Sequence, residues 1–399
     1  MNSNTPYWIW LQSALGAGAR IKEITEYFGG VKEVYDAGET QWKMSPVLVP
    51  RQVEHLKNCS LAQANDILTV CRLNSWQVIT PDDENYPRRL YEIDNPPAAL
   101  YVAGNLPDID NSVAIGIVGT RKASDYAIKA ADVMSRGIAK LGAVVVSGGA
   151  LGVDTAAHNA AILSSGKTVA VLGCGLGTNY LMENKPLRDS IAANGALVTE
   201  FQPFTKASRY TFPVRNRIIS GLSLGVLVVE AGIRSGSLIT AGYAADQGRD
   251  VYAIPCSILE SEYAGTNKLI DQGAVVATKP LDLVYPYAER YGIDVSGAKS
   301  VGAIMKETSH KTVNAKETSG ISFENLNISR EKRAERQKAA AQLSGNTLTV
   351  YRALGEDYMH VDEIAAKTSL GTGAVLTALT ALEIADLVQS AGGKRYKLS

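Results

Sequence analysis

The sequence predicts an α/β fold whose core is a doubly wound parallel sheet. Three observations indicate it: short apolar runs recur, each is followed by Gly- or Ser-rich residues, and a helical pattern comes next. Continuous Val, Ile and Leu strands separated by helices are typical of a parallel sheet that is covered on both faces. We therefore expect a Rossmann-like core over residues 81–290, with strands at 113–118, 143–147, 168–172, 196–200, 224–230 and 251–255.

Three segments flank this core. Residues 1–80 are expected to form short helices, in a domain of the SAM or helix-hairpin-helix type. The turn Gly16–Arg20 would suit DNA-backbone binding in a helix-hairpin-helix, but such turns occur more often as plain connections. Residues 291–342 are polar and charged, which predicts a linker with one helix near 330–342. Residues 343–399 show three helical patterns and a hairpin, which predicts a winged-helix domain.

The composition excludes some classes of protein and leaves others open. Of the 399 residues, 46% are hydrophobic, which predicts folded domains rather than wholesale disorder. Lys and Arg total 40, as do Asp and Glu, and this neutrality says nothing about nucleic acid, because a local cluster is what attracts a polyanion. The four cysteines form no CxxC pair and indicate free thiols in a reducing cytosol. With no apolar run long enough to cross a bilayer and no signal-peptide pattern, we expect a cytoplasmic protein without membrane insertion.

Ligands of open parallel sheets bind beyond the carboxyl ends of the strands, where helix N-termini present free N–H groups. Two turns of this kind follow the first two core strands, and they contain Gly119, Thr120 and Arg121, and Ser147 and Gly148. A dinucleotide site would have further glycines in the first turn and an acid at the end of the next strand, and neither is present. The glycine-rich segment 173–180 has GxGxG spacing with no helix pattern directly after it. We therefore expect no nucleotide cofactor.

The segment 201–217 is rich in cations and aromatic rings. It contains no acid and four cations, which are Lys206, Arg209, Arg215 and Arg217. It also contains four aromatic residues, which are Phe201, Phe204, Tyr210 and Phe212. Cations follow a phosphate backbone and aromatic rings stack on unpaired bases, so we predict a long loop that binds single-stranded nucleic acid. Core burial is the favoured interpretation for Phe201 and Phe212. Arg121 is expected to point at the same place, because a guanidinium adds a bidentate phosphate contact to free N–H groups.

Three other residues raise the alternative of an enzyme. Asp154 and His158 lie four residues apart on one helical face, but no third ligand has suitable spacing, so we expect structural roles and no metal site. Glu230 ends a core strand in the same cleft. Rossmann-like nucleotide phosphoribohydrolases use a Glu near a Gly-rich loop, and such an enzyme is therefore the alternative function. The acid-free segment 201–217 favours DNA instead, with Glu230 binding backbone N–H groups.

The C-terminal segment offers a second candidate surface. Its helical segment 372–388 contains no Lys or Arg, so we do not expect it to read a DNA major groove. Lys394, Arg395 and Lys397 on the hairpin could contact a phosphate backbone, although a solvated hairpin is the favoured interpretation. A module for protein interaction or dimerisation is the third hypothesis.

Eight ordered motifs between residues 84 and 280 give the sequence a specific resemblance to a known family. They are YPRRLYEIDNPPAALYVAGN, VGTRKASDYA, SGGALGVDTAAH, GKTVAVLGCGLGTNYLMENKPL, TEFQPFT, FPVRNRIISGLS, VVEAGIRSGSLITAGYAADQGRDVYAIP and GTNKLIDQGA. Together they resemble the DprA/Smf family of bacterial DNA-processing proteins. The family's order of domains, with a helical N-terminal module, a Rossmann-like core and a C-terminal winged helix, also fits.

The resemblance implies a function without catalysis. Proteins of this family bind and protect single-stranded DNA that enters during natural transformation, load the RecA recombinase onto it, and form homodimers through the core. On the family pattern the DNA pocket would include Gly119, Thr120, Arg121, Ser147, Gly148, Lys206, Arg209, Tyr210, Arg215, Asn216 and Arg217. The sequence departs from the pattern at Leu151, where the family usually has Arg, at Cys256, where it has Gly, and at Leu181-Met182, where it is Pro-rich.

Overall fold

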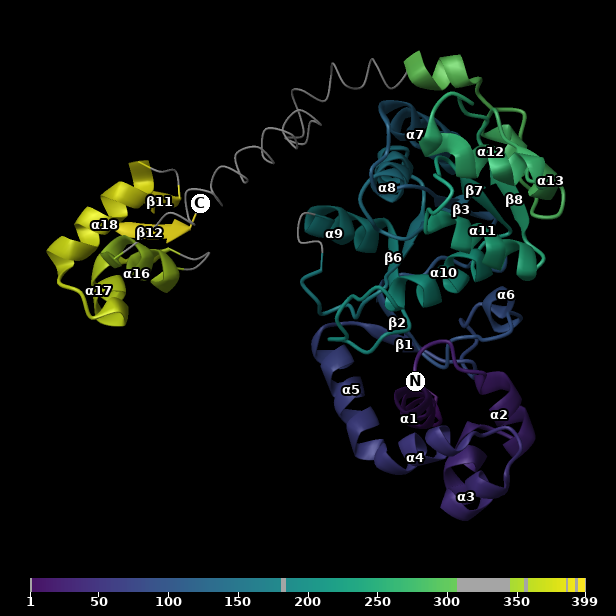
Figure 1. Cartoon of the computed structure of the whole chain (residues 1–399), viewed down its shortest axis with the longest axis horizontal. Coiled ribbons are helices and arrows are strands. Elements are labelled where there is room, and N and C mark those ends of the chain that lie inside the picture. The colour runs from purple at the N-terminus through teal and green to yellow at the C-terminus, as the bar shows by residue number, and fades with distance from the viewer. Residues whose placement is uncertain are drawn as a thin grey trace. The chain divides into compact units, whose positions relative to one another are not determined.

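The computed structural model describes residues 2–180, 184–306, 345–354, 358–384, 387–391 and 394–398. The chain forms two compact units, Met1–Lys306 and Glu307–Ser399 (Figure 1). Only residues 291–306 of the predicted linker 291–342 are described, and they belong to the first unit. The helix predicted near 330–342 lies outside the described residues, as does Leu181-Met182.

A nine-stranded sheet is the centre of the first unit, and its strand order is β1-β2-β6-β5-β4-β3-β7-β8-β9. All pairs from β6 to β9 are parallel, while β1 and β2 add antiparallel strands beside β6. The chain starts the parallel part at β3, builds outward to β6 and then crosses to β7, so the order reverses between β3 and β7. The strands are β1 Gln77–Ile79, β2 Leu100–Gly104, β3 Ala114–Val118, β4 Val144–Ser147, β5 Thr168–Val171, β6 Gly195–Thr199, β7 Gly225–Val228, β8 Asp250–Ala253 and β9 Val275–Val276.

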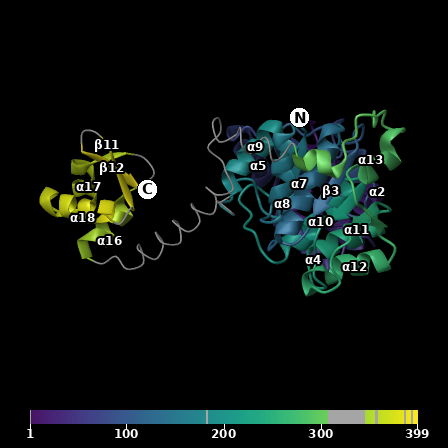
Figure 2. The ribbon, with the colours of Figure 1, turned by 90° about the horizontal axis from the view of Figure 1, so that it is seen from above.

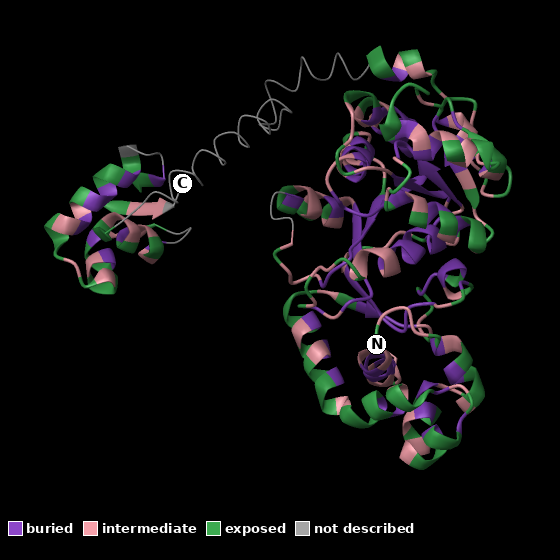
Figure 3. Ribbon diagram, viewed as in Figure 1, coloured by how far each residue is buried: buried purple, intermediate pink, exposed green. Residues whose placement is uncertain are grey.

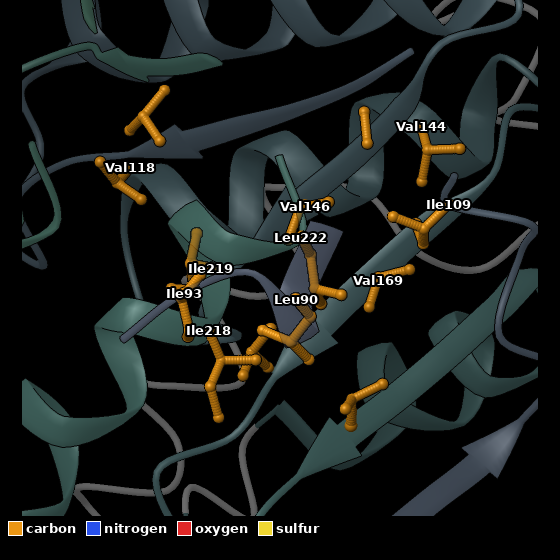
Figure 4. Close-up of a cluster of buried hydrophobic side chains, with 14 of the residues drawn as sticks. Leu90, Ile93, Ile109, Val118, Val144, Val146, Val169, Ile218, Ile219 and Leu222 are labelled. Carbon is orange, nitrogen blue, oxygen red and sulfur yellow. The ribbon is translucent and has the colours of Figure 1, made fainter. Parts of the chain in front are cut away.

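The six predicted core strands are confirmed, and the doubly wound arrangement follows from their composition. Val145 and Val146 are both fully buried, because neighbouring residues of a strand face opposite sides and helices cover both sides. One face packs against α7 Asp125–Lys140, α8 Val153–Leu163 and α13 Leu281–Ala288. The other packs against α6 Arg88–Tyr91, α10 Thr211–Gly221 and α11 Ser237–Asp246. Figure 4 shows part of this cluster, including Leu90 of α6 and Ile218 and Ile219 of α10. Figure 3 shows the strands buried between these helices.

The helices follow the sequence signals at their ends. Ser124 caps α7, since its hydroxyl accepts from the Ala127 N–H at 3.1 Å. Helices α7 and α8 lie side by side in both views (Figures 1 and 2). The core also contains α9 Lys185–Asn194, α12 Ala264–Asp271 and the short 3₁₀ helix η2 Ser261–Tyr263. No helix among the described residues is long and apolar enough to span a membrane.

The N-terminal helices are α1 Thr5–Leu15, α2 Ile21–Phe28, α3 Val31–Met44, α4 Pro50–Asn58 and α5 Leu61–Leu73. Their helical character agrees with the prediction for residues 1–80. The buried cluster around Trp8 and Trp10 also includes Val78 of β1 and Tyr101 of β2. The helices therefore bury their apolar faces against the antiparallel edge of the large sheet, within one compact unit.

The second unit has the three helices and the hairpin that the sequence predicts. They are α16 Gly345–Ala353, α17 Val361–Thr368, α18 Thr372–Ile384, β11 Val388–Ala391 and β12 Arg395–Leu398. A further short strand, β10 Met359–His360, pairs with β12 in a three-stranded sheet. Val350, Ile364, Val375 and Leu379 are buried in its core, so this unit has a hydrophobic core of its own.

The prediction of a long loop over residues 201–217 is wrong in its second half. Helix α10 begins at Thr211, so Phe212, Arg215 and Arg217 are helical. Pro213 lies in the first turn, where its missing N–H costs no hydrogen bond. The loop proper spans residues 200–210.

Candidate nucleic-acid interface

Two backbone hydrogen bonds hold the turn after β3, and they fix the backbone next to Arg121. The Thr120 N–H donates to the Glu230 carbonyl at 2.9 Å, and the Val153 N–H donates to the Thr120 carbonyl at 3.3 Å. Gly119 is required, because a Cβ there would lie 2.5 Å from a methyl carbon of Val153. Arg121 itself is exposed, and its guanidinium lies over the Phe212 ring at 4.5 Å from the centroid. The structure thus brings Arg121 to the start of α10, as the sequence predicts.

The turn after β4 is closed by Arg215. The Arg215 Nη1 donates to the Gly148 carbonyl at 2.7 Å and also to the Val171 carbonyl. Arg215 is 4% exposed, and burial lowers its pKa to about 10, so it stays charged at neutral pH. A Cβ at Gly148 would lie 2.3 Å from Nη1, and the Ser147 hydroxyl donates to the Ile117 carbonyl at 2.6 Å. Arg215 is therefore an internal support of this turn.

Arg217 and Asn216 are also buried, at 4% and 9% exposure. The Arg217 Nη2 donates to Oε2 of Glu200 at 2.6 Å, in an ion pair that leaves neither group open to solvent. The Asn216 amide donates to the Gly236 carbonyl at 3.3 Å. Their predicted role in binding stays a prediction, and the contacts of these side chains are with the protein itself.

Lys206 and Arg209 are the exposed cations of the segment 201–217. Tyr210 is 67% exposed, and Arg209 both covers its ring, at 4.9 Å from the centroid, and donates to its hydroxyl at 2.7 Å. Phe204 is 63% exposed, and its ring lies close to Gly177, where a Cβ would be 2.5 Å from Cε1. Phe201 is buried as predicted, whereas Phe212 is half-buried.

The glycine-rich segment 173–180 packs against residues 202–205 of the loop after β6. The Gly175 N–H donates to the Thr205 carbonyl at 2.9 Å, and the Gly177 N–H donates to the Pro203 carbonyl at 2.7 Å. A Cβ at Gly175 would lie 2.1 Å from the Gln202 carbonyl oxygen. These glycines therefore permit close packing of two loops, and their N–H groups are used within the protein.

The residues of the enzyme alternative have structural contacts. Asp154 accepts from the Ala150 N–H at 3.2 Å, and burial raises its pKa while the charge of Arg215 opposes that shift. His158 is fully buried, which lowers its pKa to about 3, and its Nδ1 lies 2.7 Å from the Thr168 hydroxyl. Glu230 is 1% exposed and accepts from the N–H of Ser124 at 3.3 Å and from the Ser124 hydroxyl. No group of three metal-ligating side chains occurs in the described part of the chain.

Two exposed cations near this edge were not singled out from the sequence. Lys122 follows Arg121 directly, and Arg234 lies in the loop after β7. The sequence could have indicated Arg234. Strand β7 is parallel to β3, so the loop that follows β7 leaves the sheet at the same edge as the turn that contains Arg121. Leu151, where the resemblance implies Arg, is half-buried in the turn before α8.

In the second unit, Lys394 and Arg395 are exposed and the ammonium of Lys397 lies 4.8 Å from the Tyr358 ring centroid. Helix α18, Thr372–Ile384, contains no Lys or Arg. That this helix does not read a DNA major groove stays a prediction.

Comparison with known proteins decides the family. A family model described as DNA recombination-mediator protein A matches residues 77–288. The chain belongs to the DprA/Smf family. A second model, described as the DprA winged helix domain, matches residues 334–394. The Protein Smf of Synechocystis is 31% identical over 99% of both chains, and the DNA processing protein DprA of Streptococcus pneumoniae is 43% identical over 51% of this chain and 71% of its own.

The family also agrees with the fold. The X-ray structure of DNA processing protein A from Streptococcus pneumoniae covers 70% of this chain and 97% of its own, with 34% identity and a TM-score of 0.62. The predicted fold class, with its α/β core and its C-terminal winged helix, is confirmed.

Proposed function

We propose that this protein binds single-stranded DNA without chemical turnover, along the carboxyl edge of the large sheet. The observation that carries the proposal is the combination of exposed cations and exposed rings at one place. Arg121, Lys206 and Arg209 are exposed there, and so are the rings of Phe204 and Tyr210. Cations bind the phosphate backbone, while rings stack on bases that only an unpaired strand presents.

Arg121 and the loop 200–210 come from different strands, but the structure joins them. Arg121 follows β3 and contacts Phe212, which is separated from Tyr210 by one residue. The surface on which a strand would lie therefore runs from the turn after β3 to the loop after β6. Burial of Arg215 and Arg217 divides the predicted residues into exposed groups that contact DNA and buried groups that hold the loops in place.

Membership of the family supports the cellular part of the proposal. We propose that the protein acts in the cytoplasm as a homodimer, protects incoming single-stranded DNA and delivers it to RecA, as the resemblance implies. The family model's description as a recombination mediator is consistent with this role.

The phosphoribohydrolase alternative has less support. It needs an accessible glutamate beside a mononucleotide pocket, but the Glu230 carboxylate is buried and bonded to the start of α7. The glycine-rich segment that could receive a mononucleotide is packed against residues 202–205. No observation in the described residues favours turnover over binding.

The proposal is tested by titrating fluorescent single- and double-stranded oligonucleotides at two salt concentrations, with sedimentation to measure mass. We expect salt-sensitive binding that favours the single strand, and no release of free base. Arg121→Ala and Lys206→Ala should weaken binding. The matched control is Lys167→Ala, because exposed Lys167 precedes β5 and so lies at the opposite edge of the sheet. Wild-type affinity in both test variants would refute the site.

A further inference from the structure

Helix α1 of the N-terminal domain holds the start of the loop after β6. The Gln202 Nε2 donates to the Ser13 Oγ at 2.8 Å, and the Gln12 amide donates to the Glu200 carbonyl. Ser13 and Gln202 are 189 positions apart in the sequence. The conformation of the loop after β6 therefore depends on the docking of a helix from a distant part of the chain.

A second contact reaches the same loop through the glycine-rich segment. The Leu176 side chain packs against the buried tryptophan cluster of the N-terminal domain. On one side of it the Gly175 N–H donates to the Thr205 carbonyl at 2.9 Å, and on the other side the Gly177 N–H donates to the Pro203 carbonyl at 2.7 Å. The N-terminal domain thus supports the loop directly from α1 and indirectly through Leu176.

The supported part of the loop carries two groups that we assign to the DNA site. The Thr205 N–H donates to the Gln202 carbonyl at 2.9 Å, which closes a turn. Phe204 is 63% exposed within this turn, and the exposed Lys206 follows it. A loop that is already ordered loses less conformational entropy on binding than a loop that the ligand must order. Contacts at Gln202 should therefore contribute to DNA affinity without touching the DNA.

The turn that follows α1 is also used inside the protein. Its Gly18 N–H donates to Oε2 of Glu200 at 3.3 Å, and Glu200 is buried. This N–H is one that a helix-hairpin-helix turn would offer to a DNA phosphate, but here a carboxylate of the protein accepts from it. The contacts of the N-terminal domain thus favour an indirect role in binding over a direct one.

We propose that the N-terminal domain is a platform that sets the conformation of the DNA-binding loop, with Ser13 and Gln202 as positioning residues. This inference rests on the proposed function, and it gives the N-terminal helices a role in binding that requires no contact with DNA. Coupling between two sites acts equally in both directions, so DNA binding should also stabilise the docking of α1. A partner protein that displaced α1 would weaken DNA binding.

Ser13→Ala tests the platform with little disturbance of the fold. The Ser13 hydroxyl also donates to the Ile9 carbonyl at 2.6 Å, but α1 does not need this local bond, because alanine is the better helix former. We expect single-stranded oligonucleotides to bind about twofold to fivefold more weakly, as the loss of one hydrogen bond implies. The matched control is Thr69→Ala in α5, because the exposed Thr69 hydroxyl donates in the same way to the Asn65 carbonyl at 2.9 Å. This control should bind as the wild type does.

Gln202→Ala removes the other side of the same hydrogen bond. It should weaken binding by a similar factor, and the double variant Ser13→Ala, Gln202→Ala should bind no more weakly than either single variant. Losses that multiply in the double variant would overturn the proposal, because the two residues would then act independently. Wild-type affinity in both single variants would overturn it as well. Circular dichroism checks that each variant is folded, and Gln202→Ala carries the test if Ser13→Ala does not fold.

Hydrogen exchange gives a readout without DNA. Ser13→Ala should speed amide exchange over residues 204–210, and Thr69→Ala should leave it unchanged. In the wild type, a saturating oligonucleotide should slow exchange over α1, and this effect should be smaller in Gln202→Ala. Loop exchange that is the same in Ser13→Ala and the wild type would show that α1 does not order the loop, and the proposal would fail.

Together the two measurements separate this inference from the proposed function. If the wild type binds no oligonucleotide while Ser13→Ala speeds exchange in the loop, the proposed function is wrong and the platform contact stands. If the wild type binds DNA and Ser13→Ala speeds exchange without any loss of affinity, the inference alone is wrong.

Discussion

Arg217 donates from Nη2 to the Glu200 Oε2 at 2.6 Å, and the two side chains are 5% and 1% exposed. The same carboxylate oxygen accepts from the Gly18 N–H at 3.3 Å, and the Gln12 amide donates to the Glu200 carbonyl. The ion pair thus joins the end of β6, the helix α10 and the turn between α1 and α2. The Gly16–Arg20 turn is part of this internal contact through Gly18, whose Cβ position is 3.2 Å from Val214.

Breaking this ion pair should destabilise the first unit strongly. Arg217→Ala leaves the Glu200 carboxylate buried without its partner, which costs about 3–5 kcal/mol in the free energy of unfolding. The double variant Glu200→Gln, Arg217→Met leaves no buried charge and should cost less than Arg217→Ala. Urea unfolding measures all of these. A loss below about 1 kcal/mol for Arg217→Ala would contradict a buried ion pair, because such values are typical of exposed pairs.

The salt dependence of DNA binding should distinguish exposed cations from buried ones. Each of Arg121→Ala and Lys206→Ala should lower the slope of log affinity against log salt by about one unit or less, because each removes one phosphate contact. Arg217→Lys keeps the buried charge and should leave the slope at the wild-type value. Fluorescence anisotropy at four salt concentrations gives the slopes. A smaller slope for Arg217→Lys would show that Arg217 reaches the DNA, which its burial argues against.

His158 should make the protein less stable as the pH falls. Its pKa is lowered to about 3 by burial, while the unfolded chain titrates at its ordinary value of about 6.5. Between these two values the unfolded state binds a proton that the folded state does not, so stability is present above pH 6.5 and decreases toward pH 3. The slope from this residue is about 1.4 kcal/mol per pH unit.

His158→Gln isolates that contribution. We expect the free energy of unfolding of this variant to change less between pH 7.5 and pH 5 than that of the wild type, as measured by urea unfolding at each pH. Thr168 is the hydrogen-bond partner of the His158 ring. Its hydroxyl donates to the Val145 carbonyl at 2.9 Å, so it accepts from the ring Nδ1. Identical pH profiles would mean that the pKa of His158 is the same in the folded and the unfolded protein, which would contradict a pKa lowered by burial.

Gly148 should not tolerate a side chain. Gly148→Ala places a methyl group 2.3 Å from Arg215 Nη1 and 2.6 Å from Asp154 Oδ2, and we expect a loss of about 1–3 kcal/mol in the free energy of unfolding. The control is Gly242→Ala in the exposed middle of α11, where no heavy atom lies within 4 Å of the new methyl. Alanine there should stabilise by about 0.5–1 kcal/mol, because it is the better helix former. Equal stability of the two variants would contradict the close contact.

Deletion of residues 343–399 should leave the affinity for single-stranded oligonucleotides within about twofold of the wild type. The first compact unit contains every exposed residue that we assign to the site, and α18 carries no cation. Oligonucleotide titration of the shortened protein measures this, with circular dichroism as the control for folding. A large loss of affinity would assign the winged-helix domain a direct share in binding.

The sequence predicted the parts of the fold that depend on long apolar patterns. Five of the six core strands, β3 to β7, are apolar runs that are buried along their whole length, so their signal does not depend on register. Strands β1 and β9 have three and two residues, and such short strands leave no pattern to detect. They exist because neighbouring strands offer unpaired backbone groups.

The site was predicted less completely, because charge in a sequence does not reveal burial. Arg121, Lys206 and Arg209 are exposed as expected, whereas Arg215 and Arg217 are inside. Their partners are backbone carbonyls and one glutamate at the end of β6, which lie far from them in the sequence. A local signal was present in Phe212–Ile219, where helical spacing of apolar residues indicates an α-helix with a buried face.

The loop contact between residues 173–177 and 202–205 has a consequence for the size of ligand that this edge can hold. A small molecule is held best when the protein closes around it on all sides. A polymer has two ends that must both continue past the protein, so it needs an open track. Residues 202–205 lie against Gly175 and Gly177 and occupy the space beside these glycines with the chain's own backbone, so the surface that we propose would suit a strand that continues past the protein better than a small molecule.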